Sequence, residues 1–233
     1  MTWKNITLGK FQQIDKINAQ PLADIDKALY SACILFDMTE YEMDNEKPTK
    51  VVKMMAQMQR IYETPFVPRT TSRIGEYAIN YDVSRITLGQ YIELSFFISR
   101  GPVDNAHYIL ATMASRWRKK RLTSEHRERA DYFLTQPIEI VVGAINTIQE
   151  SYAAFNKQYH LLFGVDPEVV GEVQNNDFNK RYGWIYSATQ VAQHEGISLD
   201  EAYGLGIKQA FNDLLYLKAK SKYEMEQLRT SKK

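Results

Sequence analysis

The sequence predicts a mainly α-helical protein, in which two duplicated multi-helix units are joined by a short extended or β arm and followed by a C-terminal helical extension. Three observations predict this class. Apolar residues recur at helical spacing along most of the 233 residues, and alternation with period two is convincing only in residues 76–83. The stretch Asn5–Phe11 (NITLGKF) is nearly repeated as Arg85–Tyr91 (RITLGQY).

Both copies of this motif carry the residues of a capped helix start. Thr7 and Thr87 are good N-caps, because a threonine hydroxyl can accept a hydrogen bond from an amide of the first turn. An isoleucine, Ile6 or Ile86, precedes each threonine, and an aromatic residue stands at the fourth helical position, as in a hydrophobic staple. The motif therefore predicts the first helix of each unit.

The first unit, residues 1–63, is predicted to contain four helices. Pro21 ends the first helix, and Pro48 fits the first turn of the fourth. Thr39 with Glu42 resembles the capping box of a short third helix. The expected helices lie at about residues 7–18, 22–36, 39–43 and 48–62.

Residues 64–85 form the predicted arm between the units. The apolar members of its alternating pattern are Tyr77, Ile79, Tyr81 and Val83. Because a lone strand needs a partner, it pairs either with residues 66–74 as a hairpin or with another chain. We therefore regard these four residues as a candidate interface arm.

The second unit, residues 86–163, repeats further landmarks of the first. Asp26–Tyr30 (DKALY) lines up with Asp104–Tyr108 (DNAHY), in the same order relative to the repeated helix start. The unit is predicted to end in a long helix at about residues 137–162, with a broad apolar face.

Residues 164–176 have the composition of a linker, and residues 177–233 are predicted to be a helical pair with a charged tail. The expected helices lie at about residues 177–194 and 198–217. Gly204 and Gly206 weaken the second of these by about 1 kcal/mol each relative to alanine. The last ~15 residues are expected to form a solvated helical tail.

Composition excludes several classes of protein. The net charge of +1 favours neither a nucleic-acid binder nor a protein for acidic ligands. The single cysteine, Cys33, excludes an intrachain disulfide and a multi-thiolate metal site, and its apolar neighbours indicate a buried structural thiol. With no secretory signal and no apolar run of about 18 residues, we expect a soluble cytoplasmic protein without a membrane partner.

Catalytic motifs are missing from the sequence. It contains no HExxH, CxxC, Walker or GxSxG pattern, and the apolar segment around His107 is typical of a hydrogen-bonded core histidine. We therefore expect no catalytic residue, no metal and no cofactor, and predict that the protein is not an enzyme.

One cluster of basic residues is a candidate for binding a partner or nucleic acid. It consists of Arg116, Trp117, Arg118, Lys119, Lys120 and Arg121. Cations with an aromatic ring suit phosphate contacts and base stacking. Two other interpretations stay open, namely a solvated loop whose indole packs into the core, and docking on an acidic surface of a protein partner.

Several segments carry a resemblance to a known group of proteins. They are Ile86–Leu94, Arg129–Leu134, Gln136–Pro137, Gly143–Ala144, Phe155–Tyr159 and Tyr182–Tyr186. Together they resemble helical morphogenesis proteins of tailed bacteriophages, among them the crAss-like phages of gut Bacteroidetes. The resemblance implies a virion component of the neck or tail, or a tail assembly chaperone, located in the virion or in the host cytoplasm during assembly.

The leading hypothesis is therefore a non-enzymatic phage protein that acts through protein–protein contacts in virion formation. Its implied partners are other phage structural proteins or further copies of itself, and its 15 tyrosines suit such interfaces. A chaperone that is absent from the mature virion is the first alternative. A nucleic-acid-binding module that uses residues 116–121 is the second.

Overall fold

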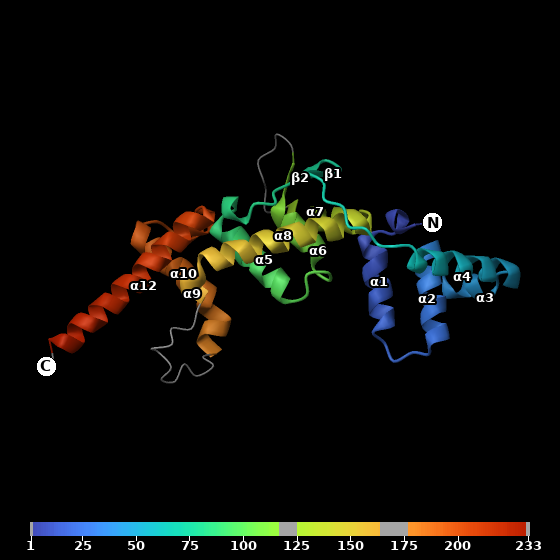
Figure 1. Ribbon diagram of the computed structural model, residues 1–233, viewed down its shortest axis with the longest axis horizontal. Coiled ribbons are helices and arrows are strands. Elements are labelled where there is room, and N and C mark those ends of the chain that lie inside the picture. Colours follow the sequence, from blue (N-terminus) through green and yellow to red (C-terminus); the bar gives the residue numbers. More distant parts are fainter. Residues whose placement is uncertain (1, 117–124, 164–176, 232–233) are drawn as a thin grey trace. The chain divides into compact units, whose positions relative to one another are not determined.

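The computed structural model describes residues 2–116, 125–163 and 177–231 (Figure 1). It confirms a mainly helical fold with a small antiparallel sheet. The chain forms two compact units: unit 1 comprises residues 1–79 and 97–147, and unit 2 comprises residues 80–96 and 148–233. This division differs from the predicted boundaries, which follow the chain in sequence.

The boundaries differ because two helices contribute to both units. They are α5 (Leu88–Ser99) and α8 (Ile138–Gln158). A helix that presents apolar side chains along its whole length can enter two cores, and the local pattern of the sequence does not show where one core ends.

Unit 1 begins with a 3-10 turn, η1 (Trp3–Asn5), and the predicted four helices. These are α1 (Leu8–Asn18), α2 (Asp24–Phe36), α3 (Glu40–Asp44) and α4 (Pro48–Glu63). The residues predicted to begin α3 and α4 do so. Thr39 and Glu42 form a reciprocal capping box at the start of α3, and Pro48 occupies the first turn of α4. Helix α2 packs against both α1 and α4.

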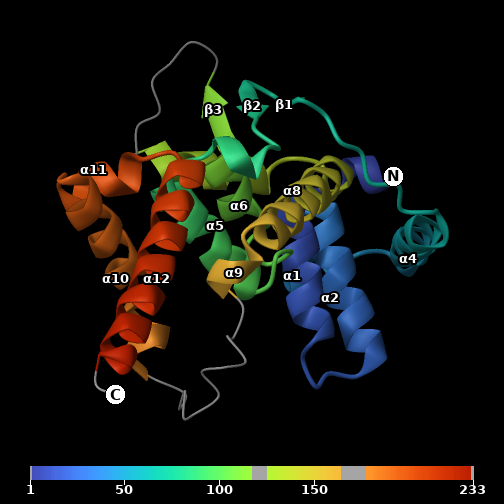
Figure 2. The same ribbon diagram turned by 60° about the vertical axis from the view of Figure 1, so that its left-hand side comes forward.

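Within the described residues, three short strands form one antiparallel sheet in unit 1, in the order β1–β2–β3 (Figure 2). They are β1 (Arg73–Ile74), β2 (Tyr77–Ile79) and β3 (Ala114–Arg116). Gly75, with a φ of +58°, takes the first position of the two-residue turn between β1 and β2. The hairpin alternative is thus confirmed, and β3 covers the other edge of β2.

The rest of unit 1 is formed by α6 (Ala106–Met113), α7 (His126–Leu134) and the first part of α8. Helices α6 and α7 pack extensively on each other. The fully buried residues of this region are Ile109, Leu110, Ala111, Phe133, Ile138, Val141 and Ala144. They form the hydrophobic core that supports the sheet.

The segment that leads into β1 runs against α8. The Arg69 amide donates to the Glu139 carbonyl at 2.9 Å, and the Thr70 hydroxyl donates to the Gly143 carbonyl at 3.1 Å. This close approach needs glycine at position 143, because a Cβ there would lie 2.2 Å from the carbonyl oxygen of Arg69.

Unit 2 contains a 3-10 turn, η2 (Val83–Arg85), most of α5, the end of α8, and four further helices. These four are α9 (His160–Phe163), α10 (Asp177–Glu195), α11 (Leu199–Gly204) and α12 (Ile207–Thr230). The predicted helix at residues 137–162 is divided into α8 and α9, and the predicted helix at 198–217 is divided into α11 and α12.

An aromatic cluster around Tyr91 makes the core of unit 2. The Tyr91 ring is fully buried, with ring centroids at 4.9 Å from Phe211, 5.4 Å from Tyr152 and 5.6 Å from Trp184. Its hydroxyl donates to the side-chain oxygen of Asn156, so the buried phenol has a polar partner. Helices α5, α8, α10 and α12 thus share one core.

The two copies of the repeated motif make the same joint, one in each unit. In unit 1 the Leu8 amide donates to the Gln136 carbonyl and the Ile138 amide donates to the Ile6 carbonyl, both at 2.9 Å. The starts of α1 and α8 are therefore paired as an antiparallel bridge.

In unit 2 the second copy repeats this pairing with the start of α12. The Leu88 amide donates to the Leu205 carbonyl at 2.8 Å, and the Ile207 amide donates to the Ile86 carbonyl at 2.9 Å. The pairing uses residues 205–206, which explains why the predicted helix at 198–217 is broken there.

The glycine of each motif lets a neighbouring chain segment approach. A Cβ on Gly9 would lie 3.2 Å from the Leu134 carbonyl oxygen, and a Cβ on Gly89 would lie 3.2 Å from the Tyr203 carbonyl oxygen. The sequence alone identified the repeat as a helix start, whereas the structure shows that it is also a docking joint.

We predict that Gly143→Ala destabilises the protein by about 2 kcal/mol or more, because the new methyl group collides with backbone that hydrogen bonds hold in place. Gly183→Ala in α10 is the matched control, since nothing lies within 4 Å of its added Cβ. The control should be neutral or stabilised by up to about 1 kcal/mol. Denaturant unfolding measures both, and equal stability of the two variants would contradict the packing described here.

Candidate functional site

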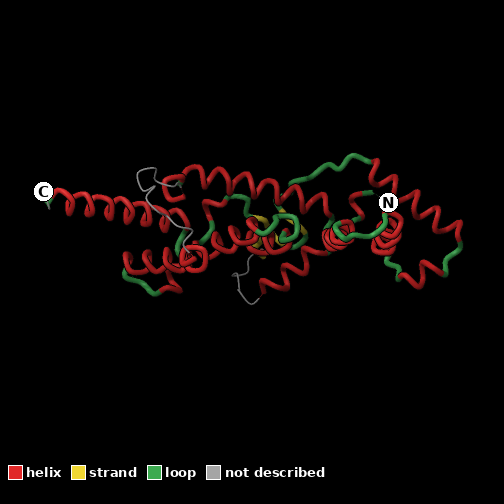
Figure 3. The backbone as a smooth tube through the Cα atoms, turned by 90° about the horizontal axis from the view of Figure 1, so that it is seen from below, coloured by secondary structure: helices red, strands yellow, loops and turns green. Residues whose placement is uncertain are grey.

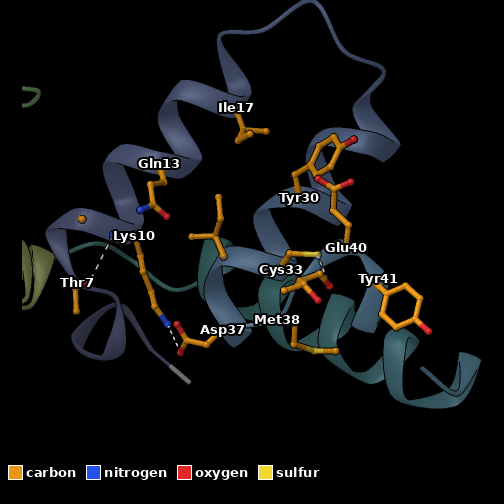
Figure 4. A pocket seen from close by; sticks show the side chains of 13 residues that line it. Thr7, Lys10, Gln13, Ile17, Tyr30, Cys33, Asp37, Met38, Glu40 and Tyr41 are labelled. Carbon is orange, nitrogen blue, oxygen red and sulfur yellow. Dashed lines mark hydrogen bonds and ion pairs between the residues drawn. The ribbon is translucent and has the colours of Figure 1, made fainter. Parts of the chain in front are cut away.

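Unit 1 contains an open groove between α1, α2 and the segment that enters α3 (Figure 4). Its volume is about 820 Å³. Its apolar lining comes from Ile17, Tyr30, Cys33, Ile34, Met38 and Tyr41, and its charged lining from Lys10, Asp37 and Glu40. A groove with an apolar floor and charged walls suits a protein segment better than a small polar substrate.

Lys10 closes one end of this groove. Its ammonium group donates to the Leu35 carbonyl at 3.2 Å and to the Asp37 carboxylate at 2.6 Å, as Figure 4 shows for the second contact. Asp37 ends α2 in the left-handed conformation, with a φ of 53°. A cation at a helix C-terminus is favourable because the last carbonyl groups carry partial negative charge. Lys10 therefore fixes the geometry of the turn between α2 and α3.

Cys33 lies on the floor of the groove and lacks the properties of a catalytic thiol. It is buried, and its thiol donates weakly to the Thr39 carbonyl at 4.0 Å. Burial, followed by the negative charge of Glu40 and Asp44, raises the pKa of the Cys33 thiol. A nucleophilic cysteine needs a lowered pKa, so this one is a structural residue in a negative electrostatic environment.

The described part of the chain shows no metal centre, since it contains no group of three His, Cys, Asp or Glu residues placed to bind one ion. No helix in the same residues has the length and apolar character needed to cross a bilayer.

A second candidate surface is the outward face of α10 in unit 2. The exposed fractions of Tyr182, Ile185 and Tyr186 are 49%, 49% and 51%, and helical spacing places these residues on one face. The opposite face carries Ala188 and Val191, which are fully buried. Helix α10 is thus apolar on two sides, and the core of unit 2 covers one of them.

A third candidate surface is the C-terminal half of α12. Every described residue from Lys218 to Ser231 is exposed, and Figures 1 and 3 show this part of the helix running past the other helices of unit 2. Three large apolar side chains in this exposed part, Tyr223, Met225 and Leu228, have exposed fractions above one half. The predicted helical tail is confirmed, but it is more apolar than a purely solvated helix requires.

The candidate interface arm does not form an exposed surface. Tyr77, Ile79 and Val83 are buried within this chain, and β2 is paired along both edges. The strand covers only residues 77–79, so Tyr81 lies beyond it. Burial of these three side chains within the chain leaves little of the candidate arm accessible to a partner, and its interface role stays a prediction.

The basic cluster lies mostly outside the described residues. Arg116 is the last residue of β3, and its backbone is paired with Tyr77. Residues 117–121 fall within the stretch 117–124, which lies outside the described residues. Its role in binding a partner or nucleic acid stays a prediction.

Sequence reasoning missed the groove and the outward face of α10. The groove depends on where α1 packs against α2, which no local pattern encodes. The face of α10 had a signal, because Tyr182, Ile185 and Tyr186 fall at positions i, i+3 and i+4, away from the stripe with Trp184 and Ala188.

No protein-family model matches the chain, and no curated protein or solved structure is similar to it. The functional argument therefore rests on the surfaces described above.

We predict that the paired change Glu40→Gln with Asp44→Asn lowers the pKa of Cys33, because it removes negative charge that favours the protonated thiol. The pH profile of iodoacetamide alkylation, followed by mass spectrometry, should move to lower pH. The raised pKa of the folded state stabilises the protein below the unfolded-state pKa of about 8.5, and this contribution is lost as the pH rises through the folded pKa.

The matched control for this experiment is Asp24→Asn with Asp26→Asn. It removes the same charge from the first turn of α2, and neither residue contributes to the pKa shift of Cys33. The control should leave the alkylation profile unchanged. A shift of equal size in both pairs would show that the effect of Glu40 and Asp44 is not local.

Proposed function

We propose that this protein is a structural or assembly protein of a tailed bacteriophage, which acts through protein–protein contacts in virion formation and performs no catalysis. The observation that carries the proposal is the pair of half-exposed apolar faces in unit 2, on α10 and on the C-terminal half of α12. Contiguous exposed apolar side chains mark contact sites more often than isolated ones do.

The outward face of α10 has the composition of an interface. Tyrosine provides a large contact area with little loss of conformational entropy, and it keeps a polar group for the rim of the contact. The Gln190 side-chain amide donates to the Tyr186 hydroxyl at 2.8 Å, which holds that ring on the helix surface. A preorganised aromatic side chain of this kind supports binding of a partner protein.

The resemblance to phage morphogenesis proteins supplies the class of assembly, and the described site chemistry is compatible with it. The groove in unit 1 holds a thiol with a raised pKa and a lysine engaged in a helix cap. Neither group is poised for acid–base or nucleophilic chemistry. The surfaces for contact therefore carry the function.

Mass spectrometry of purified virions tests this proposal. We expect the chain to be present in stoichiometric amounts, as a component of the neck or tail, and its gene to lie beside portal, tape-measure or tail genes. Absence from virions, together with a requirement for tail assembly, would assign the chaperone role instead. A gene outside any phage module would overturn the proposal.

A variant pair tests the contact surface itself. Ile185→Asp places a charge on the outward face of α10, and we expect it to reduce incorporation into particles at least about tenfold, since burying an unpaired charge is costly. Val52→Asp changes an isolated exposed valine of α4 and serves as the control. Both variants should remain within about 0.5 kcal/mol of the parent stability. Equal incorporation of both would exclude this face as the contact.

A further inference from the structure

We propose that the C-terminal half of α12 of one copy docks into the α1–α2–α3 groove of a second copy, so that the chain associates with itself head to tail. This inference rests on the proposed contact-based function and names one partner for it. The apolar stripe of the helix, the apolar floor of the groove and the opposite net charges of the two segments support this contact.

The helix carries an apolar stripe, interrupted between Leu217 and Met225, that its own unit covers only in part. The stripe consists of Ile207, Ala210, Leu214, Leu217, Met225 and Leu228, which fall on one side of the helix. Ile207 and Ala210 are fully buried in unit 2, whereas Met225 and Leu228 are 53% and 62% exposed. The same face is therefore core in the first half of α12 and uncovered in the second half.

The exposed half of α12 is basic. Residues 218–231 contain four basic residues, Lys218, Lys220, Lys222 and Arg229, against the two acidic residues Glu224 and Glu226. The Lys218 ammonium donates to the Leu161 carbonyl at 2.6 Å, and Lys220 lies 3.9 Å from Glu224, so the net charge of this half is positive but partly engaged. A basic helix with one apolar stripe needs a partner surface that is both apolar and acidic.

The groove of unit 1 has these two properties. Tyr41, at its rim, is 77% exposed, and the floor holds Ile17, Ile34 and Met38. Residues 24–46 contain the acidic residues Asp24, Asp26, Asp37, Glu40, Glu42, Asp44 and Glu46, with Lys27 as their only basic residue. Only Asp37 and Glu40 of these line the groove, and the others belong to the same acidic segment. The apolar floor therefore lies in a segment of net negative charge, which is complementary to the exposed half of α12.

Part of this negative charge is balanced within unit 1, and part remains. Asp37 is paired with Lys10 at 2.6 Å, and Glu46 with Lys50 at 2.6 Å. The charge of Glu40 and Asp44 reaches the groove floor, where it contributes to the raised pKa of the buried Cys33 thiol. An incoming cation at the rim would find these two carboxylates beside it.

A second copy of the chain is the occupant that these features select. Each copy carries one such helix and one such groove, so the two surfaces are present in equal numbers without another protein. A contact between two different surfaces is heterologous, and such a contact builds a closed ring or an open filament of copies. A nucleic acid would use the basic charge of the helix but would leave the acidic groove without a partner.

A mixing experiment tests this arrangement in the full chain. The groove variant carries Glu40→Lys and Asp44→Lys, and the helix variant carries Met225→Ser and Leu228→Ser. By sedimentation, the parent should grow beyond a monomer between about 1 and 100 µM, and its dissociation constant should rise at least about tenfold between low and high salt. Each variant alone should stay monomeric.

The decisive sample is the equimolar mixture of the two variants. It keeps one intact helix and one intact groove, so it should form a dimer of unlike chains and nothing larger. If the mixture stays monomeric while the parent associates, the contact is not head to tail, and the proposal is overturned. In a chain that combines the groove variant with Lys220→Glu, Lys222→Glu and Arg229→Glu, the reversed charges should restore association.

Cross-linking at the rim of the groove is a second, independent test. In the double variant Tyr41→Cys with Met225→Cys, a short bis-maleimide should link the rim thiol of one copy to the helix thiol of another and produce a ladder of products larger than dimers, since Tyr41 is 77% exposed. Tyr41→Cys with Tyr223→Cys, whose second thiol lies on the opposite side of α12, is the matched control and should give no ladder. A cross-link formed only within one chain would overturn the proposal, because the helix would then occupy its own groove.

Failure of this inference is distinguishable from failure of the proposed function. A parent chain that is monomeric at every concentration, yet stoichiometric in virions, would overturn self-association and leave the phage role intact. A chain that associates head to tail but has no part in particle assembly would overturn the phage role and leave the contact intact.

Discussion

The arrangement of both units depends on one interaction, the antiparallel pairing of two helix starts. The first amides of a helix have no partner within the helix, and here one of them is satisfied by the carbonyl of a segment that enters another helix. Ile6–Gly9 joins α1 to α8, and Ile86–Gly89 joins α5 to α12. The same four-residue pattern, ITLG, thus places two long helices, and each helix carries the apolar face on which its unit is built.

The packing of these helices determines which of their faces remain exposed. In unit 2 the Tyr91 cluster buries one face of α10 and the first half of α12, whereas the other face of α10 is half exposed and the end of α12 is exposed. In unit 1 the turn after α2, held by Lys10 and Asp37, opens a groove instead of a closed core. The contact-based function proposed above would use such surfaces.

The candidate site shows where tertiary structure overrides a local pattern. The alternation at residues 76–83 indicated a strand correctly, but only the fold could show that β3, from about 35 residues further on, would cover its second edge. Tyr77 lies in the core of unit 1, whereas Val83 lies beyond β2 and is buried in the 3-10 turn η2. Conversely, the tyrosines of α10 have an ordinary helical pattern, and their exposure depends on which of two apolar faces the Tyr91 cluster covers.

The sequence by itself determined the helical class, most helix starts and the helical tail, because caps, prolines and apolar spacing act within a few residues of each other. Thr39 and Ser198 cap their helices, and Pro48 occupies the first turn of α4, as the sequence predicts. Only the tertiary structure decided the partners of the two ITLG starts, the break at Leu205–Gly206, the division into units and the position of the groove. These depend on contacts between residues far apart in the chain, whose free energies are set by packing and close approach and leave no periodic trace in the sequence.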